Sequence, residues 1–145
     1  MNAAAFNRIY QDVVIDRLLQ HGFVKHASSA YLIGDDTILA LLRFEDKGDA
    51  LLQATNLIVC LRHTFLRELV ELEVPTPFAA DVNDYPVKER PSGLPKTATN
   101  WHYQPNNLGV DDTDCDRIEY GGLDATKAQA LHLQSLRVCV PPWQT

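Results

Sequence analysis

The sequence predicts an α+β fold, in which an antiparallel sheet of about four to six strands carries an N-terminal and a C-terminal helix on one face. Three observations lead to this expectation. An amphipathic helix opens the chain, apolar strand-like segments follow it through tight turns, and a second helical pattern lies near the C-terminus. Strands joined by tight turns are most simply antiparallel, and a helix with one apolar stripe needs a surface to cover.

The first helix is expected over residues 3 to 20. Its apolar residues recur at helical spacing: Phe6, Ile9, Tyr10, Val13, Val14 and Leu18. Gly22 suits the left-handed conformation of a helix C-cap. The C-terminal helix is expected over residues 124 to 136, with Asp124 as its N-cap.

The strands are expected over residues 23–33, 37–45, 50–62, 85–90 and 100–103. The second of them is almost continuously apolar, which is typical of a central strand covered on both faces. The apolar runs of the second and third strands therefore predict the middle of the sheet.

The middle of the chain is rich in proline, since six of the eight prolines lie between residues 75 and 110. Such a composition predicts a loop-dominated segment that runs over the surface. Residues 63 to 73 fit neither period cleanly, and we expect a short helix that ends before Pro75. A length of 145 residues is typical of one domain, so we expect residues 1–145 to form a single α+β domain.

The charge and the cysteine count limit the class of protein. The net charge is −6, which disfavours nucleic acid as a partner and would complement a basic protein. Three widely spaced cysteines form no disulfide framework. We find no signal peptide, and no apolar run approaches the ~18 residues of a membrane span. These observations predict a cytoplasmic protein with no membrane partner, and they leave the oligomeric state open.

Two patterns could hold a metal ion, and neither is complete. Cys60 and His63 would need two more ligands, and a strand would point them to opposite faces, so a buried cysteine is the better interpretation. The aspartates of residues 112–116 alternate as in a calcium loop. However, Arg117 stands where that loop needs glycine, and Leu123 where it needs glutamate. We expect an acidic, solvated loop there, and no metal or cofactor.

One part of the chain combines aromatic and basic residues in a polar setting. Aromatic and arginine side chains are the usual anchors of binding surfaces. The candidate binding residues are therefore Arg62, Lys88, Arg90, Trp101, His102 and Tyr103. The alternative is that Trp101 and Tyr103 lie on the core face of a strand, with His102 pointing outward.

The order of the expected elements also resembles a known family. Its features are the Gly22-Phe23 pair after the first helix, the third strand with Thr55-Asn56, the segment Arg90-Pro91-Ser92-Gly93-Leu94, and Trp101. Over about residues 5 to 105 the chain is similar to small bacterial α+β proteins known only as a domain of unknown function. It departs by one residue of spacing in residues 90–94, and it has His102 where the family has a second tryptophan. The resemblance implies the fold but no established activity, although some domains of this kind are suspected to be immunity proteins that neutralise toxins.

Two functions follow as hypotheses. The first is a non-catalytic protein-binding or immunity-type module, because no catalytic motif is present and the chain is acidic. The alternative is a small hydrolase-like enzyme that uses Cys60 or a histidine in a pocket near Arg90 and Trp101. Burial of Cys60 away from the histidines would favour the first. A deep cleft that holds Cys60, a histidine and an acid would favour the second.

Overall fold

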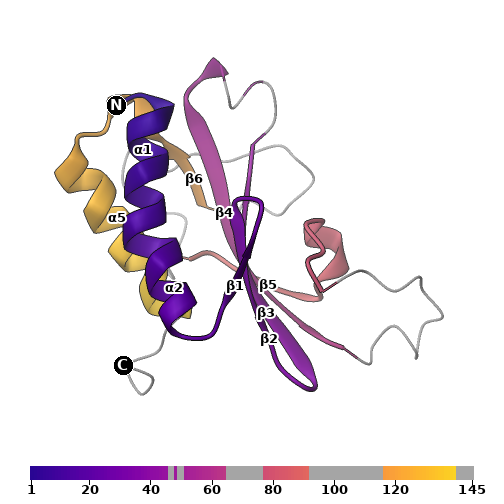
Figure 1. Cartoon of the computed structure of the whole chain (residues 1–145). Helices are drawn as coiled ribbons and strands as arrows, with labels where there is room; N and C mark the ends of the chain where they lie inside the picture. The colour runs from indigo at the N-terminus through magenta and orange to yellow at the C-terminus, as the bar shows by residue number, and fades with distance from the viewer. Residues whose placement is uncertain (46–47, 49–50, 65–76, 92–115, 140–145) are drawn as a thin grey trace.

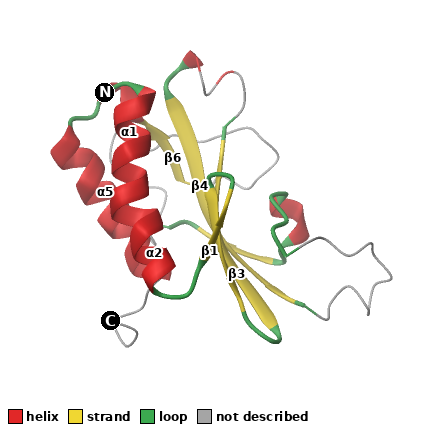
Figure 2. Cartoon of the chain, viewed as in Figure 1, coloured by secondary structure: helices red, strands yellow, loops and turns green. Residues whose placement is uncertain are grey.

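The computed structural model describes residues 1–45, 48, 51–64, 77–91 and 116–139. Within these ranges six strands form one antiparallel sheet, and the N-terminal and C-terminal helices lie side by side on one of its faces (Figures 1 and 2). The strand order is β1-β2-β3-β4-β5, and β6 also pairs with β4. The predicted α+β architecture is therefore confirmed.

The first helix is continuous but changes its winding once. It consists of α1 (Ala3–Tyr10), a π-helical segment η1 (Gln11–Ile15) and α2 (Asp16–Gln20), which together match the expected range. Gly22 follows with a φ of +89°, as predicted for a residue beyond the helix end.

A second long helix and two 3₁₀ turns lie further along the described part of the chain. Helix α5 spans Ala125–Cys139, and Asp124 Oδ1 accepts a hydrogen bond from the Lys127 backbone N–H at 2.9 Å, so the predicted N-cap is confirmed. The described 3₁₀ turns are η2 (Val82–Asp84) and η4 (Tyr120–Gly122).

The expected first strand, residues 23–33, is wrong as a single strand, because it folds into a hairpin. The six strands are β1 (Val24–His26), β2 (Ser29–Ile33), β3 (Thr37–Phe44), β4 (Ala54–His63), β5 (Val87–Glu89) and β6 (Asp116–Glu119). His26 pairs with Ser29, so Ala27 and Ser28 form a two-residue turn, and Ala27 has a φ of +53°. Neither residue is the glycine or asparagine that normally signals such a turn, so the pattern predicted one strand with a weak middle at residues 27–30.

Other boundaries also differ from expectation. Strand β4 begins at Ala54 rather than at residue 50, because Gln53 has a φ of +53° and breaks the extended chain. Asp116 is 1% exposed and opens β6, so an acidic solvated loop is wrong for this residue. The expected strand near residues 85–90 is confirmed as β5. Residues 65–73 and 100–103 lie outside the described residues, and of the expected helix over 63–73 only His63 and Thr64 are seen, at the end of β4.

Two apolar clusters lie on the two faces of the sheet. The cluster beneath the helices joins both long helices to the inward residues of β3, β4 and β6, with Leu41, Leu57 and Ile118 fully buried. The cluster on the opposite face contains Ala40 and Ile58 and is covered by part of the proline-rich segment: Phe78, Ala79 and Tyr85. The sheet is thus buried on both sides at its centre.

The edge of the sheet beyond β4 is divided between two strands. Strand β5 pairs with Val59–Leu61, and β6 pairs with the preceding stretch, Ala54–Leu57. Where β5 ends and β6 begins, Arg90 Nε donates to Asp116 Oδ1 at 2.7 Å, and both side chains are buried. This ion pair joins the two strands, which are far apart in the sequence.

Candidate functional site

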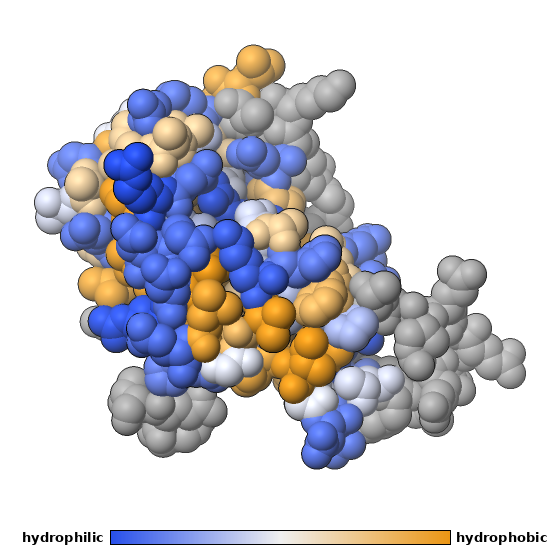
Figure 3. Space-filling view, in the orientation of Figure 1, coloured by the Kyte–Doolittle hydropathy of each residue, from blue (hydrophilic) through white to orange (hydrophobic). Residues whose placement is uncertain are grey.

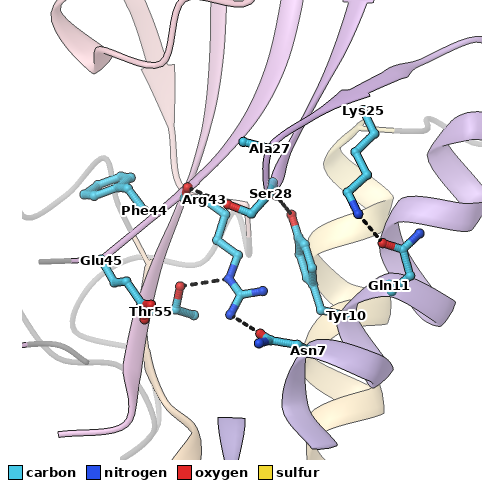
Figure 4. Close-up of a pocket in the computed structure, with 10 residues that line it drawn as sticks. All are labelled: Asn7, Tyr10, Gln11, Lys25, Ala27, Ser28, Arg43, Phe44, Glu45 and Thr55. Carbon is cyan, nitrogen blue, oxygen red and sulfur yellow. Dashed lines mark hydrogen bonds between the residues drawn. The ribbon is translucent and has the colours of Figure 1, made fainter. Parts of the chain in front are cut away.

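A cavity of about 510 Å³ opens where the first helix, the β1–β2 turn and the end of β3 meet (Figure 4). Its lining residues come from the first helix, from β1 and the β1–β2 turn, and from the ends of β3 and β4. They are Asn7, Tyr10, Gln11, Lys25, Ala27, Ser28, Arg43, Phe44, Glu45 and Thr55. Figure 3 shows that the outer surface of the neighbouring helix is mainly hydrophilic, while hydrophobic residues gather over β1 and β2.

The guanidinium of Arg43 is held in place on several sides. Its Nε donates to Thr55 Oγ1 at 3.0 Å, and its Nη2 donates to Asn7 Oδ1 at 2.5 Å. Its central carbon lies 4.8 Å from the centre of the Tyr10 ring and 5.4 Å from that of Phe6. Cations over aromatic rings at such distances are attracted to the ring face. The position of the charged group is therefore fixed before any ligand arrives.

The β1–β2 hairpin positions the backbone of Arg43. The regular pairing of β2 with β3 stops at Ala30 and Leu41. Beyond that pair, the Arg43 backbone N–H donates to the Ser29 hydroxyl at 3.0 Å, and the Ser28 hydroxyl donates to the Arg43 carbonyl at 3.4 Å. Two serine side chains thus replace the missing backbone partners of β3, and this explains why serines stand at the turn.

The charge of Arg43 is not neutralised by an ion pair in the described residues. Burial lowers the pKa of its guanidinium, and the nearby Glu45 carboxylate acts in the opposite direction. An arginine still keeps its proton in a protein at neutral pH. In the described ranges, no carboxylate oxygen lies within salt-bridge distance of this guanidinium. The pocket therefore holds a fixed positive charge.

A second cation lies at the rim of the same pocket. Lys25 Nζ donates to Gln11 Oε1 at 2.8 Å, and Gln11 Nε2 in turn donates to Asp16 Oδ1 at 2.8 Å. Gln11 is also the first residue of the π-helical segment. Single π-helical turns inside α-helices are frequently found at functional sites.

A buried histidine lies behind the aromatic wall of the pocket. His132 is fully buried, with ring centres 4.9 Å from Phe6 and 5.3 Å from Tyr10. Neither ring nitrogen has a hydrogen-bond partner in the described part of the protein. Burial, with the charge of Arg43 as a second cause, lowers its pKa to about 3. His132 is therefore neutral at physiological pH.

The residues predicted from the sequence lie elsewhere. Arg62 is buried, with its guanidinium carbon 5.7 Å from the centre of the Tyr85 ring, and Arg90 is buried against Asp116. Lys88 is half-buried, opposite Cys60 on β4. Arg62, Lys88 and Arg90 do not line the pocket around Arg43. Trp101, His102 and Tyr103 lie outside the described residues.

The cysteine and histidine considered for chemistry are separated. Cys60 is fully buried in the cluster with Ile38, Ala40 and Tyr85, whereas His63 is exposed at the end of β4. Three positions apart on a strand, the two side chains point to opposite faces. Among the described residues, no group of three His, Cys, Asp or Glu side chains could hold a metal ion. None of the described helices is long and apolar enough to cross a bilayer.

Sequence reasoning missed Arg43, although one signal was available. Residues 39, 41 and 43 share one face of β3, and Leu39 and Leu41 belong to or pack against the cluster beneath the helices. An arginine on the same face of the strand as buried leucines needs hydrogen-bond or aromatic partners for its guanidinium. The partners come from Asn7, Tyr10 and Thr55, which no sequence motif connects.

Comparisons with protein-family models, with curated proteins and with solved structures found no match. The resemblance to the bacterial domain of unknown function therefore stays a prediction.

Proposed function

We propose that this protein is a non-catalytic protein-binding module whose recognition site is the pocket around Arg43. The observation that carries the proposal is an arginine fixed by Asn7, Thr55 and Tyr10 at an open cavity, with no carboxylate paired to it among the described residues. A side chain held in this way keeps little conformational entropy to lose on binding.

The composition of the pocket supports recognition of a protein. Arginine and tyrosine are among the residues that most often dominate binding energy at protein interfaces, especially where they are surrounded by well-packed neighbours. Arg43 meets both conditions, and the buried Tyr10 that packs against it is anchored through its hydroxyl to the Ser28 carbonyl at 3.2 Å. A site on rigid elements is also more precise than one on loops.

The placement of the nucleophile and of one base argues against the hydrolase alternative. A catalytic nucleophile must touch its substrate, and Cys60 is fully covered by the apolar cluster around it. His132 is covered as well, and its pKa of about 3 leaves it a poor proton acceptor at neutral pH. Both residues are better explained as parts of the core.

The net charge of −6 supports a partner that is basic overall, as for an immunity-type module. Opposite net charges raise the rate of association, and this effect weakens with salt. Overall charge would bring the partner to the surface, and the pocket would then bind one group of it.

Affinity capture from the native host, with quantitative mass spectrometry, tests this proposal. Lys25→Glu reverses a charge at the pocket rim, and Arg17→Glu makes the same change on an exposed position of α2 that does not line the pocket. We expect Arg17→Glu to retain the captured protein and Lys25→Glu to lose it. Equal capture by the two variants would show that the pocket is not the recognition site.

A further inference from the structure

We infer that the group of the partner which enters the pocket is a carboxylate, from an acidic side chain or a chain terminus. This inference rests on the proposed function and adds the chemistry of the bound group. The unused donors of Arg43 and the charges around the pocket support it.

Arg43 retains most of its hydrogen-bonding capacity. A guanidinium has five N–H donors, and two of them are used by Thr55 and Asn7. The remaining three include both hydrogens of Nη1, which have no acceptor among the described residues. Because Arg43 lines the cavity, these donors are available to a ligand. A carboxylate is the group that an arginine binds best through two parallel hydrogen bonds.

Lys25 supplies a second positive charge. Its ammonium has three donors, and one is used by the neutral Gln11 amide. Gln11 holds this ammonium at the rim without neutralising it. In Figure 4, Lys25 and Arg43 lie on either side of Tyr10, so the two cations flank its ring.

The charges that line the pocket favour an anion with a single charge. Arg43 and Lys25 contribute two positive charges and Glu45 one negative charge, which leaves an excess of one positive charge. A carboxylate carries one negative charge and balances this excess. A phosphate carries about 1.5 to 2 negative charges at neutral pH, so Glu45 would repel the surplus.

Titration of the full ¹⁵N-labelled chain, followed by NMR, tests the inference. The probes are a short peptide with blocked termini and one glutamate, its glutamine counterpart, benzoate and inorganic phosphate. We expect the glutamate peptide to shift the Arg43 Nε–H signal and the amide signals of Ser28 and Thr55, and the glutamine peptide to leave them unchanged. Arg43→Lys should weaken binding about tenfold, because an ammonium cannot replace the planar fork.

Variants at exposed positions keep the test valid if Arg43→Lys fails to fold. Lys25→Gln removes one charge at an exposed site and should weaken binding about threefold, which is a modest effect for a rim charge. Arg17→Gln, on α2, should leave binding unchanged. Equal binding of the glutamate and glutamine peptides, or tighter binding of phosphate, would overturn the inference.

The remaining outcomes separate this inference from the proposed function. If benzoate binds at Arg43 and the glutamate peptide does not, the pocket binds the carboxylate of a small molecule. The protein-binding function then fails. If no carboxylate probe binds but Lys25→Glu still loses the captured protein, the inference fails and the proposed function stands.

Discussion

A single buried imidazole illustrates how the core beneath the pocket is built. His132 lies between the rings of Phe6 and Tyr10, and among the described residues neither of its nitrogens finds a hydrogen-bond partner. A buried polar group without a partner loses its hydration and destabilises the folded state by about 1–3 kcal/mol. The ring contacts offset part of this loss. The charged form would be far less favourable, since burial removes its hydration and the positive charge of Arg43 lies nearby.

The free energy of unfolding should therefore decrease as the pH falls below neutrality. The pKa of His132 is about 3 in the folded protein and near 6.5 in the unfolded chain, so the unfolded chain takes up the proton first as the pH falls. Neutral His132 therefore lowers the free energy of unfolding by nothing above about pH 6.5, and its proton uptake in the unfolded chain lowers that free energy progressively toward pH 3. We expect the free energy of unfolding to be about 2 kcal/mol lower at pH 5 than at pH 7.5 from this residue alone. Urea denaturation at the two pH values measures it.

His132→Phe is the matched control for that measurement. Phenylalanine fills a similar space between the two rings but cannot take up a proton. The difference in stability between pH 5 and pH 7.5 should shrink by about 2 kcal/mol in this variant. An unchanged difference would show that His132 is not held neutral in the folded protein.

At the scale of elements, the β1–β2 hairpin is where sequence reasoning failed and the pocket is formed. The short turn Ala27-Ser28 carries no glycine or asparagine, and the residues on both sides have strand character, so the pattern indicated one strand. The turn brings Ser28 and Ser29 to the backbone of Arg43. A turn that is stabilised by contacts with residues distant in the sequence carries none of the local residue types that normally mark a turn.

Ala27→Gly should stabilise the protein. Ala27 has a φ of +53°, a conformation that costs an L-residue about 1–2 kcal/mol and glycine almost nothing. The greater entropy of glycine in the unfolded chain removes about 0.5–1 kcal/mol of this gain. We expect a net gain of about 0.5–1 kcal/mol by thermal or chemical denaturation. Ala27→Val should have the opposite sign, and a loss in both variants would contradict the turn geometry.

A buried ion pair lies at the junction of β5 and β6. Arg90 and Asp116 are 6% and 1% exposed, and removal of one partner of a buried pair destabilises proteins by about 3–5 kcal/mol. We expect Asp116→Ala to lower the free energy of unfolding by this amount in denaturation experiments. Glu119→Gln is the control, because Glu119 is 37% exposed and lies 3.9 Å from Arg117, so its effect should stay below about 1 kcal/mol. Similar losses in the two variants would contradict the burial of the pair.

At the scale of the whole molecule, the layers could be predicted and the pocket could not. The apolar stripe from Phe6 to Leu18 predicted a helix on a sheet, and the apolar run of 37–45 predicted a central strand, because each of these signals is local. The pocket depends on which strands are neighbours and on their register, which set Arg43 beside Thr55 and Asn7. The sequence identified Arg62 and Arg90 as candidate binding residues because they are cationic. Their burial depends on tertiary packing, which no local pattern predicts.

The central position of β3 gives a test of the layered architecture. Leu41 is fully buried beneath the helices, so Leu41→Ala should lower the free energy of unfolding by about 2–5 kcal/mol. Leu51 is 86% exposed and provides a leucine outside the core. Leu51→Ala should change stability by less than about 0.5 kcal/mol. Equal losses at the two positions, measured by urea denaturation, would contradict the assigned layers.

The most direct test of the recognition site is photo-crosslinking in the native host. A benzoylphenylalanine at Ala27 lies on the pocket lining, and the same group at Asp36 lies in the turn at the other end of β2. We predict a covalent adduct with one partner protein from the Ala27 position and none from Asp36. Adducts from Asp36 with none from Ala27 would show that the partner binds away from the pocket.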